Sequence, residues 1–243
     1  MTMPHDDHGR GEAPGEAPID RPAFGRASIY HFLEIALAHP DEDGLDWIAA
    51  PSTEAALGAA LDDLPRAEAL VEARAALEAF FAKLRATAHD LVEAEHIALF
   101  AANFPTVPCP PYGSLFTVEE AKRLEEMTAI KAFYRDSGFD VAGAFDDLPD
   151  HLCVELELLH ALAHRAETAE DGREVAWARA RAASFVDRFL TPFIDRLAVI
   201  AEAAEPDNAY TRLLTATRHI VAHHRAELAA DAAAAPENKG HLA

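Results

Sequence analysis

A run of prolines near the middle of the chain is the strongest constraint on how this sequence can fold. Four of the seven residues from 105 to 111 are proline: Pro105, Pro108, Pro110 and Pro111. A proline fixes its own φ, lacks a backbone donor and pushes the preceding residue out of the α region, so no helix can cross here. The same stretch carries five apolar side chains: Phe104, Val107, Tyr112, Leu115 and Phe116. We therefore predict an extended hinge, residues 104–116, packed against the helical halves that it joins.

Apolar residues recur at helical spacing before the hinge. They predict helices over residues of about 24–39, around 45–48, from an N-cap at Ser52 to about 62, from after Pro65 to about 84, and from about 89 to 101. The third of these helices is assigned its start because serine is a preferred N-cap residue.

The pattern after the hinge is also helical. Thr117 and Glu120 have the spacing of a capping box, so a helix should start there and end near Ser137-Gly138. Further helices are expected from about 148 to 169, from 172 to about 189, from a Thr191 cap with Pro192 in the first turn, and from after Pro206 to about 230. Sustained strand-like alternation is absent from the sequence. We predict an all-α, compact bundle of about nine to eleven helices.

The organisation along the chain follows from composition. Residues 1–22 are rich in proline, glycine and charge and poor in apolar side chains, so we expect a disordered tail. Residues 23–230 are expected to form one helical domain, with an N-terminal half (23–103), the hinge and a C-terminal half (117–230). Residues 231–243 are expected to be a flexible tail.

The charge of the chain excludes some partners. The sequence has 21 Lys and Arg against 42 Asp and Glu, a formal net charge of -21. Such a field repels nucleic acid and anionic lipid and attracts cations. Two cysteines, no apolar run of about 20 residues and an N-terminus unlike a secretory signal predict a protein of the reducing cytoplasm, without nucleic-acid binding or stable membrane insertion.

Polar side chains are dense on the helix expected from residue 148. Asp150 can cap the free N–H groups of the helix, whereas His151 gains no such benefit and needs another reason. Glu155 shares a face with His151, and Glu157, His160 and His164 lie on another. A solvated helix face explains the second group, but a metal site built from either group is the alternative.

Three motifs in order give a resemblance to a known family. Residues 95–100 (Glu-His-Ile-Ala-Leu-Phe), 110–116 (Pro-Pro-Tyr-Gly-Ser-Leu-Phe) and 148–159, with Asp-His-Leu-x-x-Glu-Leu inside, resemble motifs of the TorD/DmsD chaperones for molybdenum redox enzymes, which are related to NarJ. The resemblance covers roughly residues 30–224. Near its end the chain departs from the family, with Phe193 where many relatives have tryptophan.

The resemblance implies a non-catalytic cytoplasmic chaperone without a cofactor of its own. It would bind the twin-arginine leader and the immature catalytic subunit of a molybdoenzyme until the client's cofactor is inserted. The residues carried over as peptide-binding are Glu95, Leu99, Phe100, Pro111, Tyr112, Ser114, Phe116, Asp150, His151 and Glu155. Carboxylates beside an apolar groove suit an arginine pair followed by an apolar segment.

Three hypotheses remain open at this point. The first is the chaperone, as a monomer or as a dimer that exchanges its halves through the hinge. The second is a helical metal-binding protein or metalloenzyme that uses the His/Glu cluster at 151–164. The third is an acidic adaptor that binds folded partners and has no affinity for an isolated leader.

Overall fold

The computed structural model describes residues 25–139 and 148–234, and within these ranges the chain is helical without a strand. Tyr112 and His151 form an isolated antiparallel β-bridge. The predicted all-α class is confirmed, and so is the expected number of helices. The tail predicted at 1–22 and residues 235–243 of the tail predicted at 231–243 lie outside the described residues.

The helices before the hinge lie close to the ranges predicted from the spacing of apolar residues. They are α1 (Arg26–Leu37), α2 (Glu42–Ala49), α3 (Pro51–Asp62), α4 (Glu68–Ala86), α5 (His89–His96) and a π-helical turn, Ile97–Ala101. The N-cap of α3 is Ala50, with Pro51 in the first turn, so the prediction of Ser52 as cap was wrong. Proline suits that turn because its missing N–H would have no partner in the helix.

The second half contains α6 (Ser114–Thr117), a 3-10 turn (Glu120–Lys122), α7 (Arg123–Asp136), α8 (Leu152–Thr168), α9 (Gly172–Phe185), a π-helical turn (Val186–Leu190), α10 (Thr191–Ala204) and α11 (Ala209–Ala234). The last helix continues through 231–234, where a tail was expected. Among the described helices, none is both long and apolar enough to serve as a membrane span.

Two predicted helix starts in this half were wrong. The hydroxyl of Thr117 donates to the carbonyl of Gly113 instead of capping α7, which begins only at Arg123. The chain also stays helical through Thr191, whose N–H bonds to Val186 O in the π-helical turn. Pro192 lacks the N–H and its ring crowds the carbonyl four residues back, and a wider turn relieves that crowding. The predicted end of α7 is confirmed, with Gly138 at φ 71.

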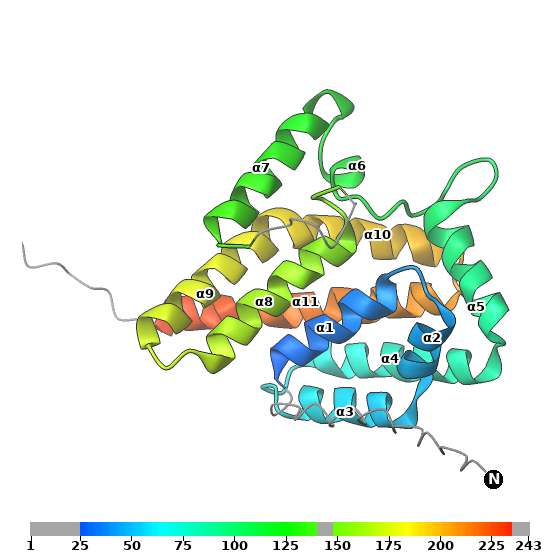
Figure 1. The fold of residues 1–243 in the computed structure, drawn as a ribbon, viewed down its shortest axis with the longest axis horizontal. Coiled ribbons are helices and arrows are strands. Elements are labelled where there is room, and N and C mark those ends of the chain that lie inside the picture. The colour runs from blue at the N-terminus through cyan, green and yellow to red at the C-terminus, as the bar shows by residue number, and fades with distance from the viewer. Residues whose placement is uncertain (1–24, 140–147, 235–243) are drawn as a thin grey trace, which may run out of the picture.

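The two halves of the sequence share one core. Helix α1 packs along α8, and α4 packs along α11, so each pair joins a helix from before the hinge to one from after it (Figure 1). The buried stripe of α4 is the one that the periodicity predicts: Leu70, Ala73, Leu77, Phe80, Phe81 and Leu84. The hinge therefore connects interleaved helices, and α7 extends away from them at one edge of the molecule (Figure 1).

Candidate functional site

The hinge is anchored at its centre and exposed at its start. Cys109 is fully buried, its N–H donates to Leu99 O over 3.0 Å, and its thiol faces Leu197 O at 3.8 Å. Burial raises the pKa of this thiol to about 12, so it stays protonated. Phe104, in contrast, is 94% exposed, so the prediction that its ring packs against the helices was wrong. The packed part of the hinge begins after the exposed turn.

The end of the hinge pairs with the start of α8. Gly113 N donates to Asp150 O over 2.8 Å, and Leu152 N donates to Pro111 O over 2.9 Å. The rings of Tyr112 and His151 meet edge to face, with centroids 5.3 Å apart. Two predicted site segments that are distant in sequence thus lie side by side.

The residue that caps α8 is His151, and not Asp150 as the sequence predicted. His151 is the N-cap of α8, and its Nδ1 accepts a hydrogen bond from Cys153 N over 3.2 Å. Asp150 does not cap α8, because its Oδ2 accepts from Ser114 N at 3.0 Å, at the start of α6. The carboxylate therefore ties the hinge to α8, and the histidine has the structural role that the sequence did not indicate.

Asp150 and Glu155 form a buried pair of carboxyl groups, which we call the acidic pair. They are 0% and 1% exposed. Asp150 Oδ1 and Glu155 Oε2 have no hydrogen-bond partner within the described residues. Burial, and then the neighbouring Asp150, raise the pKa of Glu155 well above its ordinary value. An unpaired buried carboxyl group destabilises the fold, so this pair is a site where a cation would be stabilising.

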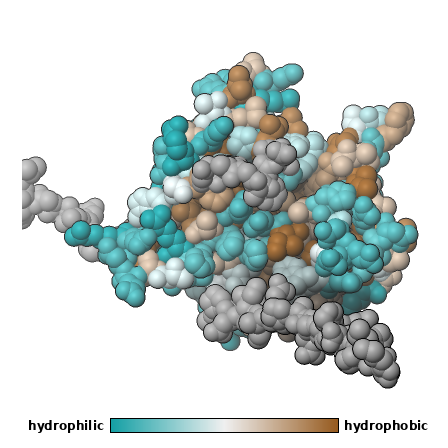
Figure 2. All heavy atoms as spheres, viewed as in Figure 1, coloured by the Kyte–Doolittle hydropathy of each residue, from teal (hydrophilic) through white to brown (hydrophobic). Residues whose placement is uncertain are grey.

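An apolar groove opens next to the acidic pair. The α6/α10 groove has a volume of about 430 Å³ and is lined by Leu115, Phe116, Asp195, Arg196, Val199 and Ile200. Apolar surface gathers where α6 and α10 meet (Figure 2). Sequence reasoning missed its α10 wall, although Val199 and Ile200 are apolar residues outside the buried stripe of that helix.

Two aromatic rings connect the groove to the acidic pair. Phe116 stacks on the buried Phe193, with ring centroids 5.7 Å apart. A Cβ atom on Gly113 would lie 3.1 Å from Glu155 Oε1 and 3.3 Å from Phe193 Cδ1. Glycine at this position therefore lets the hinge, the acidic pair and the groove wall approach one another.

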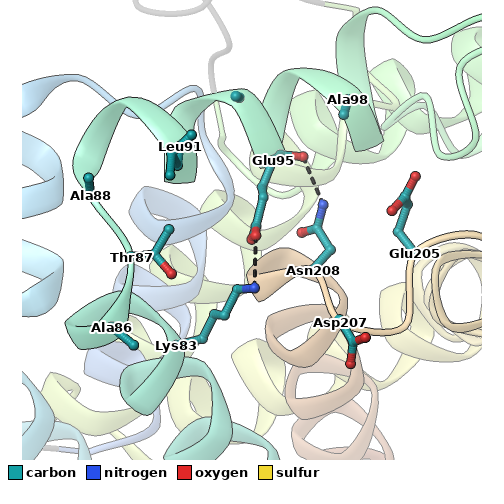
Figure 3. Close-up of a pocket in the computed structure, with 11 residues that line it drawn as sticks. Lys83, Ala86, Thr87, Ala88, Leu91, Glu95, Ala98, Glu205, Asp207 and Asn208 are labelled. Atoms are coloured by element: carbon teal, nitrogen blue, oxygen red, sulfur yellow. Dashed lines mark hydrogen bonds and ion pairs between the residues drawn. The ribbon is translucent and has the colours of Figure 1, made fainter.

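The remaining predicted residues lie elsewhere. Glu95 accepts from Ala209 N over 2.8 Å and pairs with Lys83 over 3.0 Å, at the edge of a separate pocket of about 550 Å³ between α5 and the start of α11 (Figure 3). Leu99 and Phe100 are buried in the core. The structure thus brings together Pro111, Tyr112, Ser114, Phe116, Asp150, His151 and Glu155, and leaves the motif at 95–100 outside this cluster.

The histidines and carboxylates predicted as alternative metal ligands do not assemble as expected. Within residues 25–139 and 148–234, one group has metal-ligand geometry, and it consists of His31, Glu34 and His160. His151 with Glu155 is not such a group, nor is Glu157 with His160 and His164. Only His160 of the predicted ligands takes part, with partners from α1.

The described residues form a helical fold with a groove beside the hinge junction, and comparison with known proteins gives its family. Residues 63–199, more than half of the chain, match the family described as nitrate reductase delta subunit. The chain belongs to this family of maturation chaperones, the NarJ/TorD type, which confirms the resemblance drawn from its motifs. The members of this family are chaperones rather than catalysts.

A solved structure supports the same architecture. It is that of a candidate redox enzyme maturation protein from Archaeoglobus fulgidus, with a TM-score of 0.51, 18% identity, and coverage of 81% of this chain and 94% of that one. At this identity the likeness concerns the fold. No curated protein sequence matches the chain.

Proposed function

We propose that this protein is a cytoplasmic chaperone for a molybdenum-containing oxidoreductase of the DMSO reductase family, and that it binds the twin-arginine leader of the immature catalytic subunit. It holds the subunit until the client's cofactor is inserted and carries no cofactor itself. The observation that carries this proposal is the acidic pair, two buried carboxyl groups with unpaired oxygens beside an apolar groove.

An arginine is the cation that best fits the acidic pair. Its planar guanidinium has five donors and can bind two carboxyl groups at once, and it is less strongly hydrated than an ammonium group. Because Asp150 and Glu155 are inaccessible in the closed form, the guanidinium enters when the hinge separates from α8. Two backbone hydrogen bonds, Gly113 N to Asp150 O and Leu152 N to Pro111 O, close that junction.

The apolar part of a leader has a place next to the arginine site. Val199 is 54% exposed and Ile200 36%, so the α6/α10 groove has apolar surface available for burial. The net charge of -21 attracts a basic leader from a distance. Recognition then combines electrostatic attraction of the leader, pairing of its arginine with the buried carboxyl groups, and burial of its apolar segment in the α6/α10 groove.

The same arrangement allows two oligomeric states. Helices α1 and α4 pack against α8 and α11 across the hinge, so the chain acts as a monomer or as a dimer whose protomers exchange these halves. Light scattering after size-exclusion chromatography distinguishes the two.

Titration with a synthetic leader tests the proposal. The purified chain should bind a twin-arginine leader of a molybdoenzyme saturably, a twin-lysine version at least tenfold more weakly, and both more weakly at high salt. Asp150→Asn and Glu155→Gln should each reduce leader affinity. Asp62→Asn, at an exposed carboxylate that pairs with Arg74, is the matched control and should leave affinity unchanged.

The pH dependence of the same titration reports on Glu155. Its pKa is raised in the free chain, whereas a bound guanidinium stabilises the ionised form, so binding releases a proton. Affinity should therefore increase as pH rises above the ordinary carboxyl range, and Glu155→Gln should remove that increase. Wild-type affinity and an unchanged preference for the arginine leader in both variants would reject the acidic pair as the site, and no binding to any leader would favour the adaptor hypothesis.

A further inference from the structure

A second polar cluster lies between α1 and α8, which run side by side (Figure 1). His31 and Glu34 are three residues apart on α1, and His160 comes from α8. Glu34 Oε2 lies 3.6 Å from His31 Nδ1 and 3.7 Å from His160 Nδ1. The two imidazole rings lie with their centroids 4.7 Å apart and their planes tilted by 44°. Three possible ligand atoms therefore converge on one point.

These distances fit ligands around a single ion better than they fit hydrogen bonds. Ligands held about 2.0–2.1 Å from a tetrahedral ion are separated by about 3.3 Å, close to the observed spacing. A hydrogen bond between the same atoms would be about 2.7–3.2 Å long. Glu34 Oε2 is buried and has no hydrogen-bond partner within the described residues. The atom at the centre of the cluster thus lacks the contact that an ion would provide.

The charges around the cluster favour a cation. Glu34 places a carboxylate oxygen between the two imidazoles, each of which in its neutral form offers a nitrogen lone pair to an ion.

We propose that His31, Glu34 and His160 bind a divalent transition-metal ion such as Zn²⁺, with water in the remaining position. Two imidazoles and a carboxylate are a ligand set that such ions prefer over Mg²⁺ or Ca²⁺. The ion would join α1, from before the hinge, to α8, from after it. The proposed metal site shares no residue with the acidic pair, so this proposal does not depend on whether the protein binds a leader.

Metal titration of the full-length chain without an affinity tag tests the site. Zn²⁺ should bind at one equivalent in competition with a chromophoric chelator, and Co²⁺ should give the visible absorption of a four-coordinate ion. Glu34→Gln and His160→Gln should each weaken Zn²⁺ binding at least tenfold. His164→Gln and His89→Gln are the matched controls, since neither residue belongs to the cluster, and both should retain full affinity.

Thermal melting separates a lost site from a misfolded variant. Zn²⁺ should raise the melting temperature of the wild type, because a ligand of the native state stabilises it. The two cluster variants should melt cooperatively without metal and show no shift with Zn²⁺. Wild-type affinity in the Glu34→Gln/His160→Gln double variant would overturn the proposal. Loss of binding only on replacing the tail residues His5 and His8, which lie outside the described residues, would overturn it as well.

Discussion

Two buried polar clusters in this protein contrast in how their charges are balanced. Between α1 and α11, Arg26 contacts Glu227 and lies 3.2 Å from His223 Nδ1, and His223 Nε2 donates to Pro65 O over 2.8 Å. At the hinge, the acidic pair of Asp150 and Glu155 consists of two carboxyl groups, each with an oxygen that has no hydrogen-bond partner within the described residues. The first cluster combines a cation with an anion, although Arg26 Nη1 also has no hydrogen-bond partner within the described residues, whereas the second combines two acids.

The comparison indicates which buried polar groups serve the fold. A paired network strengthens the contact between helices, while an unbalanced pair costs stability and is stabilised by a partner that supplies the missing charge. Buried polar groups that destabilise the isolated chain are therefore the better indicators of a binding site. The following variants test this contrast, from the largest expected effect on stability to the smallest.

Removing the cation from the paired network should cause the largest loss. Arg26→Met leaves the partly buried Glu227 without its counter-ion, and breaking a buried pair in this way costs about 3 kcal/mol. Urea unfolding monitored by circular dichroism should show a lower midpoint for this variant. Arg85→Met is the control, because the Arg85–Glu54 pair is largely exposed and should contribute less than about 1 kcal/mol. Equal losses in the two variants would contradict the importance of the buried network.

Filling the space beside the acidic pair should have the next largest effect. In Gly113→Ala the new methyl group would lie 3.1 Å from Glu155 Oε1 and 3.3 Å from Phe193 Cδ1, and both of these side chains are buried. We expect a loss of about 2 kcal/mol in unfolding free energy together with weaker leader binding.

Gly58→Ala is the matched control for this substitution. Gly58 lies inside α3, and a Cβ atom added there would have nothing within 4 Å, so alanine should stabilise the helix by about 0.5–1 kcal/mol. A lower unfolding free energy for Gly113→Ala and a higher one for Gly58→Ala would support the close packing at the hinge. A higher unfolding free energy for both variants would contradict it.

Glu155→Gln should change the pH dependence of stability. Because the folded-state pKa of Glu155 is raised, its contribution is fully present below the unfolded pKa and is lost as pH rises through the folded value. The glutamine variant should lack this loss. Its free energy of unfolding should therefore rise relative to that of the wild type as pH increases, by about 1 kcal/mol at pH 8. Urea titrations from pH 4 to 8 measure the difference. Parallel curves for the two proteins would show that the acid is not strained in the fold.

Changing the exposed wall of the groove should have the smallest effect on stability. Val199→Ser should alter the unfolding free energy by less than about 0.5 kcal/mol, because the side chain is half exposed, while leader affinity falls several-fold. Val71→Ser on α4 is the control, since Val71 is 64% exposed and lies on a different helix. If both substitutions reduced leader affinity alike, the groove would not be the binding surface.

Most of the fold could be predicted because it depends on local patterns. The stripe of α4 and the glycine that ends α7 are properties of a few neighbouring residues. Helix caps were predicted less well. A cap residue can satisfy a distant donor, as Asp150 does for Ser114, and sequence spacing does not indicate which donor it selects.

The candidate sites illustrate the same limit. The motifs at residues 110–116 and 148–159 indicated the hinge junction, but the close approach of Glu155 and Phe193 to Gly113 brings together segments that are distant in sequence. The His31–Glu34–His160 cluster was missed because it requires the pairing of α1 with α8. The i,i+3 spacings of His31 with Glu34 and of Glu157 with His160 were the available signal.

The interleaving of the two halves has a consequence for the chain as it emerges from the ribosome. Helices α1 and α4 find their main partners, α8 and α11, only after the second half has been synthesised. Until then their apolar faces have no native surface to cover them, and the start of α11 must still reach the Glu95 carboxylate that accepts from Ala209 N. Folding is therefore expected to complete after translation, and a nascent chain of this protein would itself depend on protection from aggregation.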